Sequence, residues 1–494
     1  MSAAARSSCQ RRAALASAVL ACGLARCLGQ APPANATLLA LDAFPEALCL
    51  DGRAAFVYVA AAPQASDLWV LSFGLSPTLA FCVDLKSCVA VRDFMAGETP
   101  PASVLLPSWG VHSRSCDDNP DFCNANHVLF PIGSFSPACD MGLMVSQYDM
   151  AINATSSLRF RGPQIIAAAV TALADRKNGS MAGARDVLLT GVTFGGMAAV
   201  LAADIVHAEL RRALPGLERF KVMPVDALHP RYYSMVWMAW GNFFSDSWMT
   251  PALQFLANVT GGPSGQQPAS PALQACIAPG LPLWECLYLN ASLPHVVNSS
   301  LFLVQQMSAV WDNQCMYEGV APTDSLMQAQ CSKSSSTYRF YYECVQYPDL
   351  CAKSIVANFS IPLQQQYSAY ANASASVNGN GYFLHSCYLG VYSMSGRGNT
   401  SVWNIISVGG VTLREAVSAW WASDGTAAPM LHHDSYWNAS GVPPTAEAGL
   451  AAPAQYHAYG GADAGATAGL DAPIVPPWTS RYFTNPTCRG FPWY

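Results

Sequence analysis

One stretch near the middle of the chain, Asp186 to Val206, constrains the fold more than any other. It opens with a short apolar run typical of one buried strand, turns sharply at Gly-Val-Thr-Phe-Gly-Gly, and continues as a helix of small residues from Met197. The glycines that flank Thr193 permit a strained turn in which a Cβ on either side would clash. A strand, a glycine-flanked hydroxyl residue and a helix form the layout of a nucleophile elbow, whose usual sequence is G-x-S-x-G. The sequence therefore predicts an elbow with threonine in the place of serine.

Strands and helices alternate on both sides of this stretch. Apolar or alternating runs predict strands at 56–59, 67–74, 187–189, 220–227 and 301–304, and an Ala-rich helix from about 160 to 176. Such alternation predicts an α/β fold with a mainly parallel sheet that helices cover on both faces. Residues 30–46 are expected to be a short leader into the fold, and residues 230–300 an insertion or lid over the edge of the sheet.

The composition divides the 494 residues into three parts. Residues 1–29 are expected to be a signal peptide and 30–423 a single α/β domain, because a chain that is 52% hydrophobic has ample material for a large core. Residues 424–494 are rich in Ala, Gly and Pro with weak periodicity. We expect them to form a partly ordered extension that wraps the domain.

The first residues are typical of a secretory signal. Arg6, Arg11 and Arg12 supply positive charge, and 13–24 supply an apolar segment too short to span a bilayer. Cleavage after Gly29 would suit the need for small residues, and an uncleaved membrane anchor is the alternative. We therefore expect a protein that is secreted, either extracellular or in a cell wall.

Cysteine usage agrees with secretion. Three of the 17 cysteines precede residue 30, and the even number that remains is typical of disulfides in a secreted protein. The close spacings of Cys82 with Cys88 and of Cys116 with Cys123 favour disulfides or buried thiols over metal ligands, because no histidine lies at a suitable distance. Ten N-x-S/T sequences mark acceptors for N-linked glycans: they are Asn35, Asn153, Asn178, Asn258, Asn290, Asn298, Asn358, Asn372, Asn399 and Asn438.

The charge balance argues against some partners. Net charge is −6, lysines are few and no basic patch is visible, so we expect no nucleic-acid partner. No cofactor motif is present. We expect a monomer that needs neither a cofactor nor a metal.

Several short patches, in this order, resemble the pectin acetylesterase/Notum family of secreted carboxylesterases. The resemblance extends from about Leu48 to Cys488, and its specificity comes from the order of the patches rather than from any one of them. The patches are 49–52, 119–136, 160–162, 188–204, 225–227, 311–314, 386–387 and 485–488. The resemblance implies an α/β-hydrolase-like fold with a Ser-Asp-His triad. It also implies removal of acetyl groups from cell-wall polysaccharide or, in the Notum branch, of a lipid acyl group from a secreted signalling protein.

The triad implied by the resemblance is altered in this chain. The serine position is Thr193 in an elbow that is similar to G-C-S-A-G-G in the family. The acid position is Asp312, which is kept, and the histidine position corresponds to Gly390. Glycine has no side chain to accept a proton, and a neutral hydroxyl without a base is a poor nucleophile.

The donors that would stabilise an oxyanion are altered as well. The family has a G-G-G-W-C loop, whereas this chain has a longer run from Gly74 to Cys82 with a single glycine. The residue after the nucleophile position is Phe194 in place of a small alanine. Its amide is one expected donor and the amide of the loop at Gly74 is the other.

Other side chains offer alternatives for the lost groups. His385, upstream of Gly390, is the first candidate for a relocated base, and further candidates are His229, His432 and His433. Each is also consistent with an ordinary hydrogen-bonded or surface histidine. Asp226, at the end of a predicted strand, is a second carboxylate that would equally serve as a cap, and the run from His432 to Asp434 is expected to be a solvated loop rather than a metal site.

Three functions remain open from the sequence. The first is a family member with impaired or lost esterase machinery that acts by binding acetylated polysaccharide or another acyl ester. The second is an active carboxylic ester hydrolase in which Thr193 attacks and a relocated histidine serves as base. The third is a structural extracellular protein without a ligand.

Overall fold

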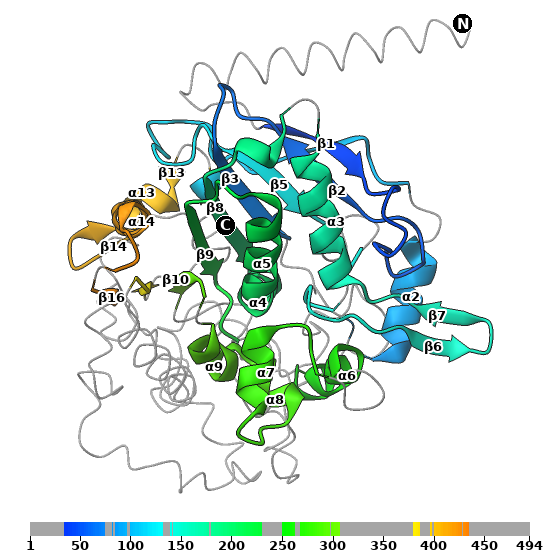
Figure 1. Ribbon diagram of the computed structural model, residues 1–494. Coiled ribbons are helices and arrows are strands. Elements are labelled where there is room, and N and C mark those ends of the chain that lie inside the picture. The colour runs from blue at the N-terminus through cyan, green and yellow to red at the C-terminus, as the bar shows by residue number, and fades with distance from the viewer. Residues whose placement is uncertain are drawn as a thin grey trace, which may run out of the picture.

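The computed structural model describes residues 34–74, 82, 84–95, 99–131, 139–140, 142–176, 179–229, 249–261, 267–296, 298–306, 379–385, 396–397, 400–426 and 428–433. A ten-stranded sheet crosses this part of the chain (Figure 1). Its strands, in sheet order, are β16 (Met430–His433), β11 (Gly381–His385), β10 (Ser300–Gln306), β9 (Arg219–Val225), β8 (Asp186–Val192), β3 (Leu68–Phe73), β5 (Asn126–Phe130), β2 (Phe56–Ala60), β1 (Asn35–Ala40) and β4 (Ser103–Leu105).

The sheet is mainly parallel, which confirms the fold class expected from the sequence. The strands from β16 to β5 all run parallel to their neighbours, whereas β2, β1 and β4 extend the sheet in antiparallel pairing. The central strand β8 is buried on both faces. Val187 and Leu189 pack into one core and Leu188 and Val192 into the other, as the continuous apolar run predicts.

Helices cover both faces of the sheet (Figure 1). One face packs against α3 (Gly162–Ala174), α4 (Phe194–Leu201) and α5 (Ala203–Ala213), and the other against α13 (Val402–Ile405), α14 (Leu413–Ala422) and the 3-10 helix η1 (Gly110–His112). The other elements are α2 (Leu85–Met95), η2 (Met181–Gly183) and three two-stranded ribbons, β6 (Met150–Asn153) with β7 (Ser156–Leu158), β12 (Gly396–Arg397) with β13 (Thr400–Ser401), and β14 (Ser407–Val408) with β15 (Val411–Thr412).

A group of short helices lies between β9 and β10, where the sequence predicts an insertion. It comprises α6 (Met249–Gly261), α7 (Pro271–Ile277), α8 (Leu283–Cys286), α9 (Leu289–Ser292) and η4 (Leu293–His295). Figure 1 shows the group gathered beyond one end of α4, and α9 and α7 contact α4 and α5 respectively. The insertion therefore packs directly on the helices that follow the elbow.

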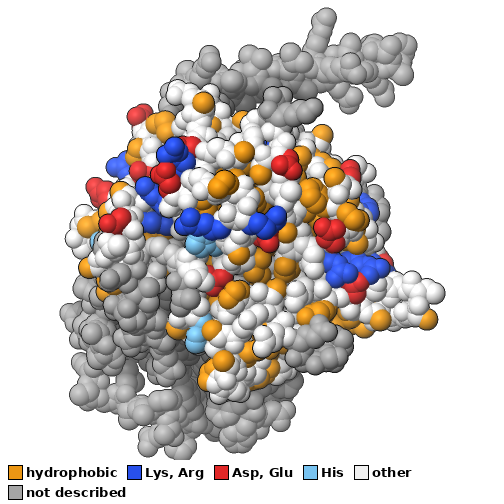
Figure 2. Space-filling model, in the orientation of Figure 1, with side chains coloured by type: hydrophobic (Ala, Val, Ile, Leu, Met, Phe, Trp, Pro, Cys, Tyr) orange, Lys and Arg blue, Asp and Glu red, His pale blue; other side chains and the backbone are white. Residues whose placement is uncertain are grey.

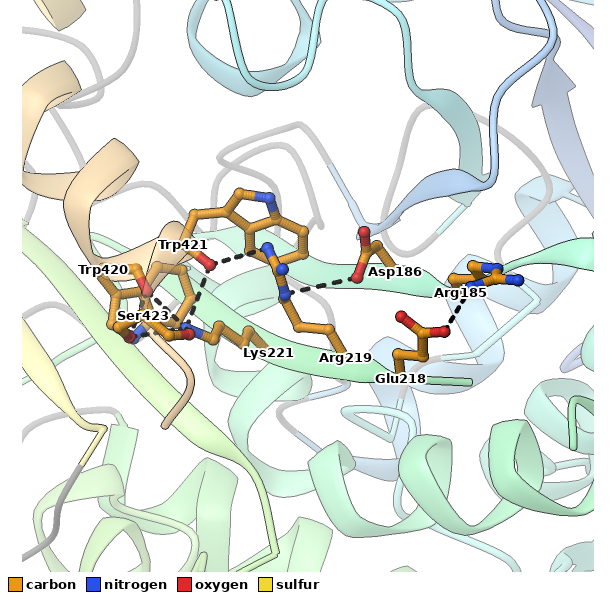
Figure 3. Close-up of polar contacts among 8 residues, drawn as sticks. All are labelled: Arg185, Asp186, Glu218, Arg219, Lys221, Trp420, Trp421 and Ser423. Atoms are coloured by element: carbon orange, nitrogen blue, oxygen red, sulfur yellow. Dashed lines mark hydrogen bonds and ion pairs between the residues drawn. The ribbon is translucent and has the colours of Figure 1, made fainter. Parts of the chain in front are cut away.

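Helix α14 is attached to the amino-terminal half of β9 by the buried Lys221 and the half-buried Arg219 (Figure 3). The Nζ of Lys221 donates to the carbonyl oxygens of Trp420 (2.5 Å) and Ser423 (2.8 Å), and Arg219 donates to that of Trp421 (3.0 Å). Burial lowers the pKa of Lys221 to about 8, so the ammonium is still protonated near neutral pH. Cations at a helix C-terminus satisfy its free carbonyls and complement its dipole.

Charged side chains of both signs share the face in Figure 2, where a band of basic groups has acidic groups close to it. Arg185 pairs with Glu218 at 2.6 Å, and Arg212 pairs with Glu209 at the same distance. Neighbouring acids therefore neutralise part of the positive charge on this face.

Three expectations about local structure were wrong. Residues 35–40 are not a leader, because they form β1 between β2 and β4. His432 and His433 are not in a solvated loop, because they end β16, which pairs with β11 beyond the expected domain limit at residue 423. The small-residue helix begins at Phe194 rather than at Met197.

Disulfides join cysteines as the sequence predicts. Cys82 pairs with Cys88 and Cys116 with Cys123, and the described residues also contain the pairs Cys49–Cys139 and Cys276–Cys286. Among the described residues, no helix combines the length and the apolarity needed to span a membrane.

Candidate functional site

Thr193 occupies the turn between β8 and α4. Its φ of 53° and ψ of −119° lie outside the regions that a β-branched residue normally adopts. The Thr193 amide donates to the carbonyl oxygen of Val225 at 2.8 Å, which ties the turn to the end of β9. The local geometry is that of an elbow, with the central side chain raised at the carboxyl end of the sheet.

Three glycines make this turn possible. An ideal Cβ on Gly195 would lie 1.9 Å from the carbonyl oxygen of Phe73, and one on Gly191 would lie 2.2 Å from that of Gly195. A Cβ on Gly196 would lie 2.7 Å from the Cβ of Ala227. The helix therefore approaches β3 and β9 at distances that only glycine allows.

The hydroxyl of Thr193 is buried and has no hydrogen-bond partner among the described residues. A serine or threonine nucleophile needs a base within about 2.6–3.2 Å, although this contact is often longer in a protein without substrate. None of the described histidines lies within hydrogen-bond distance of this oxygen. The described part of the site therefore holds an alcohol but no proton acceptor for it.

Strained backbone gathers at the carboxyl edge of the sheet. The four non-glycine residues with positive φ in the described part of the chain are Thr193 after β8, Asp226 after β9, and Leu143 and Met144 in the segment after β5. Such positions are often part of a functional site, and parallel α/β sheets bind ligands at this edge. The geometry thus points to the same edge as the elbow sequence.

Asp226 is held firmly in the structure. Its amide donates to the carbonyl oxygen of Val304 at 2.8 Å, and its Oδ1 accepts from the amide of Gln306 at 2.9 Å. The carboxylate is buried. It therefore links the ends of β9 and β10.

Phe194, the residue after the elbow, packs its ring against His229. The two ring centroids are 4.6 Å apart at an interplanar angle of 32°, and both side chains are buried. In the family patch this position is a small alanine. The larger ring fills space beside Thr193 and covers one of the histidines considered as an alternative base.

Gly74 does not present its amide to the site. Its φ is 54°, and its N–H donates to the carbonyl oxygen of Phe130 at 3.2 Å. An amide engaged in this way is not available to stabilise an oxyanion. The run from 75 to 80, which would supply the loop donors, lies outside the described residues. The Phe194 amide stays a predicted donor because it begins α4, where amides lack helical partners.

His385 ends β11 and is fully buried. Burial lowers its pKa to about 3, which makes the imidazole a weak base near neutral pH. Adjacent strands lie about 4.8 Å apart, so β11 is about 14 Å from β8 across two intervening strands. The structure does not bring His385 and Thr193 together.

Two predicted positions, Asp312 and Gly390, lie outside the described residues. In the sequence, Asp312 comes after β10, which ends at Gln306, and Gly390 comes after β11, which ends at His385. His432 is half-buried, with its ring 6.1 Å from that of Phe383 on the neighbouring strand.

The sequence did not predict a buried histidine pair on β5 and η1. The Nδ1 atoms of His112 and His127 are 3.4 Å apart, and both rings are buried. The pKa of His112 is lowered to about 3, mainly by burial and further by the nearby Arg114. The pKa of His127 is also lowered, mainly by burial and further by His112. The apolar residues Val128 and Phe130, two positions apart, could have predicted the strand β5. No sequence pattern indicated that His127 contacts His112.

Asp140 is a second buried group without a sequence signal. Burial raises its pKa to about 7, although Oδ2 accepts from the amides of Met144 (2.5 Å) and Gly142 (3.2 Å), which acts in the opposite direction. The two bonds hold the turn in which Leu143 and Met144 have positive φ. Within the described ranges, no cluster of three or more His, Cys, Asp or Glu is placed to hold a metal ion.

Comparisons with known proteins agree with this geometry. The family described as Pectinacetylesterase matches residues 29–224. Pectin acetylesterase 7 from Arabidopsis thaliana is 26% identical over 167 residues, which are 34% of this chain and 39% of that protein, so the match spans about two fifths of the relative's length.

Solved structures give the fold. One crystal form of the Wnt deacylase Notum from Drosophila has a TM-score of 0.53 at 18% identity, covering 81% of this chain and 96% of that one. A second crystal form has a TM-score of 0.49 at 18% identity, covering 78% and 93%. The first of these supports an α/β-hydrolase fold. The family match over residues 29–224 supports the resemblance to the pectin acetylesterase/Notum family that the sequence patches indicate.

Proposed function

We propose that this protein is a secreted pectin acetylesterase/Notum-like protein that binds an acyl ester at the carboxyl edge of its sheet and cleaves it slowly or not at all. The observation that carries the proposal is the Thr193 hydroxyl, which lies in an elbow without a hydrogen-bond partner among the described residues. Acetylated polysaccharide is the first candidate ligand, because a match to pectin acetylesterase is what the sequence comparison supports.

Loss of the base is the main reason to expect impaired catalysis. General acid–base catalysis contributes about 10²–10⁴-fold to rate. Gly390, at the family histidine position, offers no proton acceptor, and His385 is both distant and a weak base. The engaged amide of Gly74 supports a further loss of oxyanion stabilisation, worth about 3–4 kcal/mol per missing donor.

Retention of the scaffold supports binding. The elbow, its three glycines and the strained residues of the carboxyl edge are all present, although they cost conformational energy. The disulfides in the described part of the chain favour an oxidising, extracellular location. We therefore assign the site to an acyl ester ligand and the protein to the extracellular space or cell wall.

Hydrolysis of p-nitrophenyl acetate by the purified full chain tests the catalytic half of the proposal. We expect the parent protein and Thr193→Ala to give the same background rate, and Thr193→Ser combined with Gly390→His to give a measurable gain. A parent rate that Thr193→Ala abolishes would show an active esterase with threonine as nucleophile and would overturn the proposal.

Titration calorimetry tests the binding half. Acetylated pectin oligosaccharides should release or absorb heat on binding, and the same oligosaccharides after chemical deacetylation should bind more weakly. Equal binding of both preparations would refute recognition of the acyl group. No binding of either would favour a structural protein without a carbohydrate ligand.

A further inference from the structure

The ribbon of β6 and β7 carries one of the N-x-S/T acceptors at its turn. Asn153 ends β6, Ser156 begins β7, and these two residues are paired across a two-residue loop. The ribbon extends away from the body of the protein beside α2 (Figure 1). The Asn153 side chain is exposed at its tip.

The acceptor sequence is folded on itself at this tip. The Oδ1 of Asn153 accepts from the amide of Thr155 at 2.9 Å and from its hydroxyl at 3.1 Å. Both bonds use the amide oxygen, and neither uses the Nδ2 atom, which is the one that would carry a sugar. The contact is an Asx-turn, which Asn forms with its own backbone two residues on.

The local character of these bonds matters for modification. N-linked glycans are added to chains that have not completed folding. A turn whose partners are two residues apart does not need the rest of the fold. The Asn153 turn is therefore available to the transferring enzyme early, and its tip remains in solvent when folding is complete.

The ribbon is anchored at its base, so a glycan at the tip would not disturb the core. Leu158 is fully buried, and the Nη1 of Arg92 on α2 donates to the Oγ of Ser156 at 2.9 Å. A bulky substituent is tolerated where the side chain is exposed and its neighbours are fixed through other atoms.

Two other described acceptors lack this geometry. Asn290 on α9 is half-buried with its Oδ1 enclosed, so a sugar on this side chain would have less room than one on the exposed Asn153. In the Asn258 acceptor on α6, Thr260 is fully buried and its hydroxyl lies 2.8 Å from that of Ser146. The same three-residue sequence thus occurs in an open setting at Asn153 and in more enclosed settings at Asn258 and Asn290.

We propose that Asn153 carries an N-linked glycan and that Asn290 is unmodified in the folded protein. The sugar comes from a lipid-linked oligosaccharide diphosphate in the secretory pathway, on which this inference depends. A bond forms between Nδ2 and the anomeric carbon while the bond from that carbon to the diphosphate oxygen breaks. The diphosphate leaves with the electron pair, and Nδ2 loses one proton.

Secretion of the full chain from a eukaryotic host, followed by electrophoresis before and after treatment with an N-glycosidase, tests this assignment. Asn153→Gln should remove one glycan from the secreted protein, seen as one step of faster migration that disappears after deglycosylation. Thr155→Ala should remove the same glycan while it leaves Asn153 in place. Asn290→Gln, the matched control, should migrate like the parent protein.

Peptide mass spectrometry of the secreted parent protein gives a second readout that does not depend on any variant. Enzymatic deglycosylation converts a modified asparagine to aspartate, which should be found at position 153 and not at position 290. An unmodified Asn153 peptide, or a parent protein whose migration the N-glycosidase does not change, would overturn the inference. Neither result bears on the esterase assay, so the two proposals fail separately.

Discussion

The amide of Thr193 donates to the carbonyl oxygen of Val225, one residue beyond the last pair of the β8–β9 ladder, in which Val192 pairs with Val225. The next strand repeats the pattern, since the amide of Asp226 donates to the carbonyl oxygen of Val304. Thr193 and Asp226 both have positive φ. Backbone bonds to the neighbouring strand therefore hold these unfavourable conformations, and the elbow does not depend on catalytic side chains for its shape.

Gly195→Ala should destabilise the protein strongly. Its Cβ would lie 1.9 Å from the carbonyl oxygen of Phe73, and two backbone segments must separate to admit it. We expect a loss of about 3 kcal/mol in the free energy of unfolding, at the upper end of overpacking effects. Gly216→Ala is the control, because nothing lies within 4 Å of its added Cβ. Urea denaturation followed by fluorescence measures both, and equal stability of the two variants would contradict the close approach.

Asp226→Ala should cost more stability than Asp226→Asn. Alanine removes the acceptor of the Gln306 amide and tolerates positive φ poorly, whereas asparagine keeps an acceptor oxygen and is enriched in that region. We expect a loss of about 2–3 kcal/mol for alanine and less than about 1 kcal/mol for asparagine. Thermal unfolding of the two variants distinguishes them. Equal losses in the two variants would show that the negative charge, which both remove, matters rather than the acceptor.

Lys221→Met should loosen α14. The buried ammonium donates to the carbonyl oxygens of Trp420 and Ser423 (Figure 3). Its removal takes a donor from both, although the Trp420 carbonyl keeps the Ser423 hydroxyl as a partner. We expect a loss of about 1–3 kcal/mol, the cost of one buried unsatisfied acceptor. Arg185→Met, which breaks the exposed pair with Glu218, should cost at most about 1 kcal/mol. Hydrogen exchange of the α14 amides should increase in the first variant alone.

Acid should destabilise the fold through the buried histidine pair. The folded pKa of His112 is about 3, below its ordinary value of 6.5, because burial and Arg114 oppose its charge. Below pH 6.5 the unfolded chain binds a proton that the folded one rejects, so stability falls as pH decreases from 6.5 towards 3. The slope is at most about 1.4 kcal/mol per pH unit for this group.

The variant His112→Leu isolates that contribution. It retains His127 and removes one titrating ring, so the free energy of unfolding should fall less steeply between pH 6.5 and pH 4 than in the parent protein. Chemical denaturation at a series of pH values gives the two slopes. Identical slopes would mean that His112 titrates normally in the folded state.

Local patterns in the sequence were enough to predict the centre of the sheet. β8, β9 and β10 are buried on both faces, so their apolar runs are continuous, and the glycines mark the elbow. Next to the edge strand β4, β1 has an irregular pattern of exposed and buried residues and was not predicted as a strand. β5 is buried at almost every position, but it begins with the polar residues Asn126 and His127, so its sequence lacks the apolar run that predicts a buried strand.

The sequence by itself determined the elbow and the parallel α/β sheet, because each depends on neighbours along the chain. Tertiary structure alone decided which polar groups meet. Lys221 contacts Trp420 across 199 residues and His112 contacts His127 across 15, while His385 is held three strands away from Thr193. The packing of distant segments sets these distances, and it also sets the burial that shifts each pKa. The periodicity of residues along the chain predicts neither the distances nor the burial.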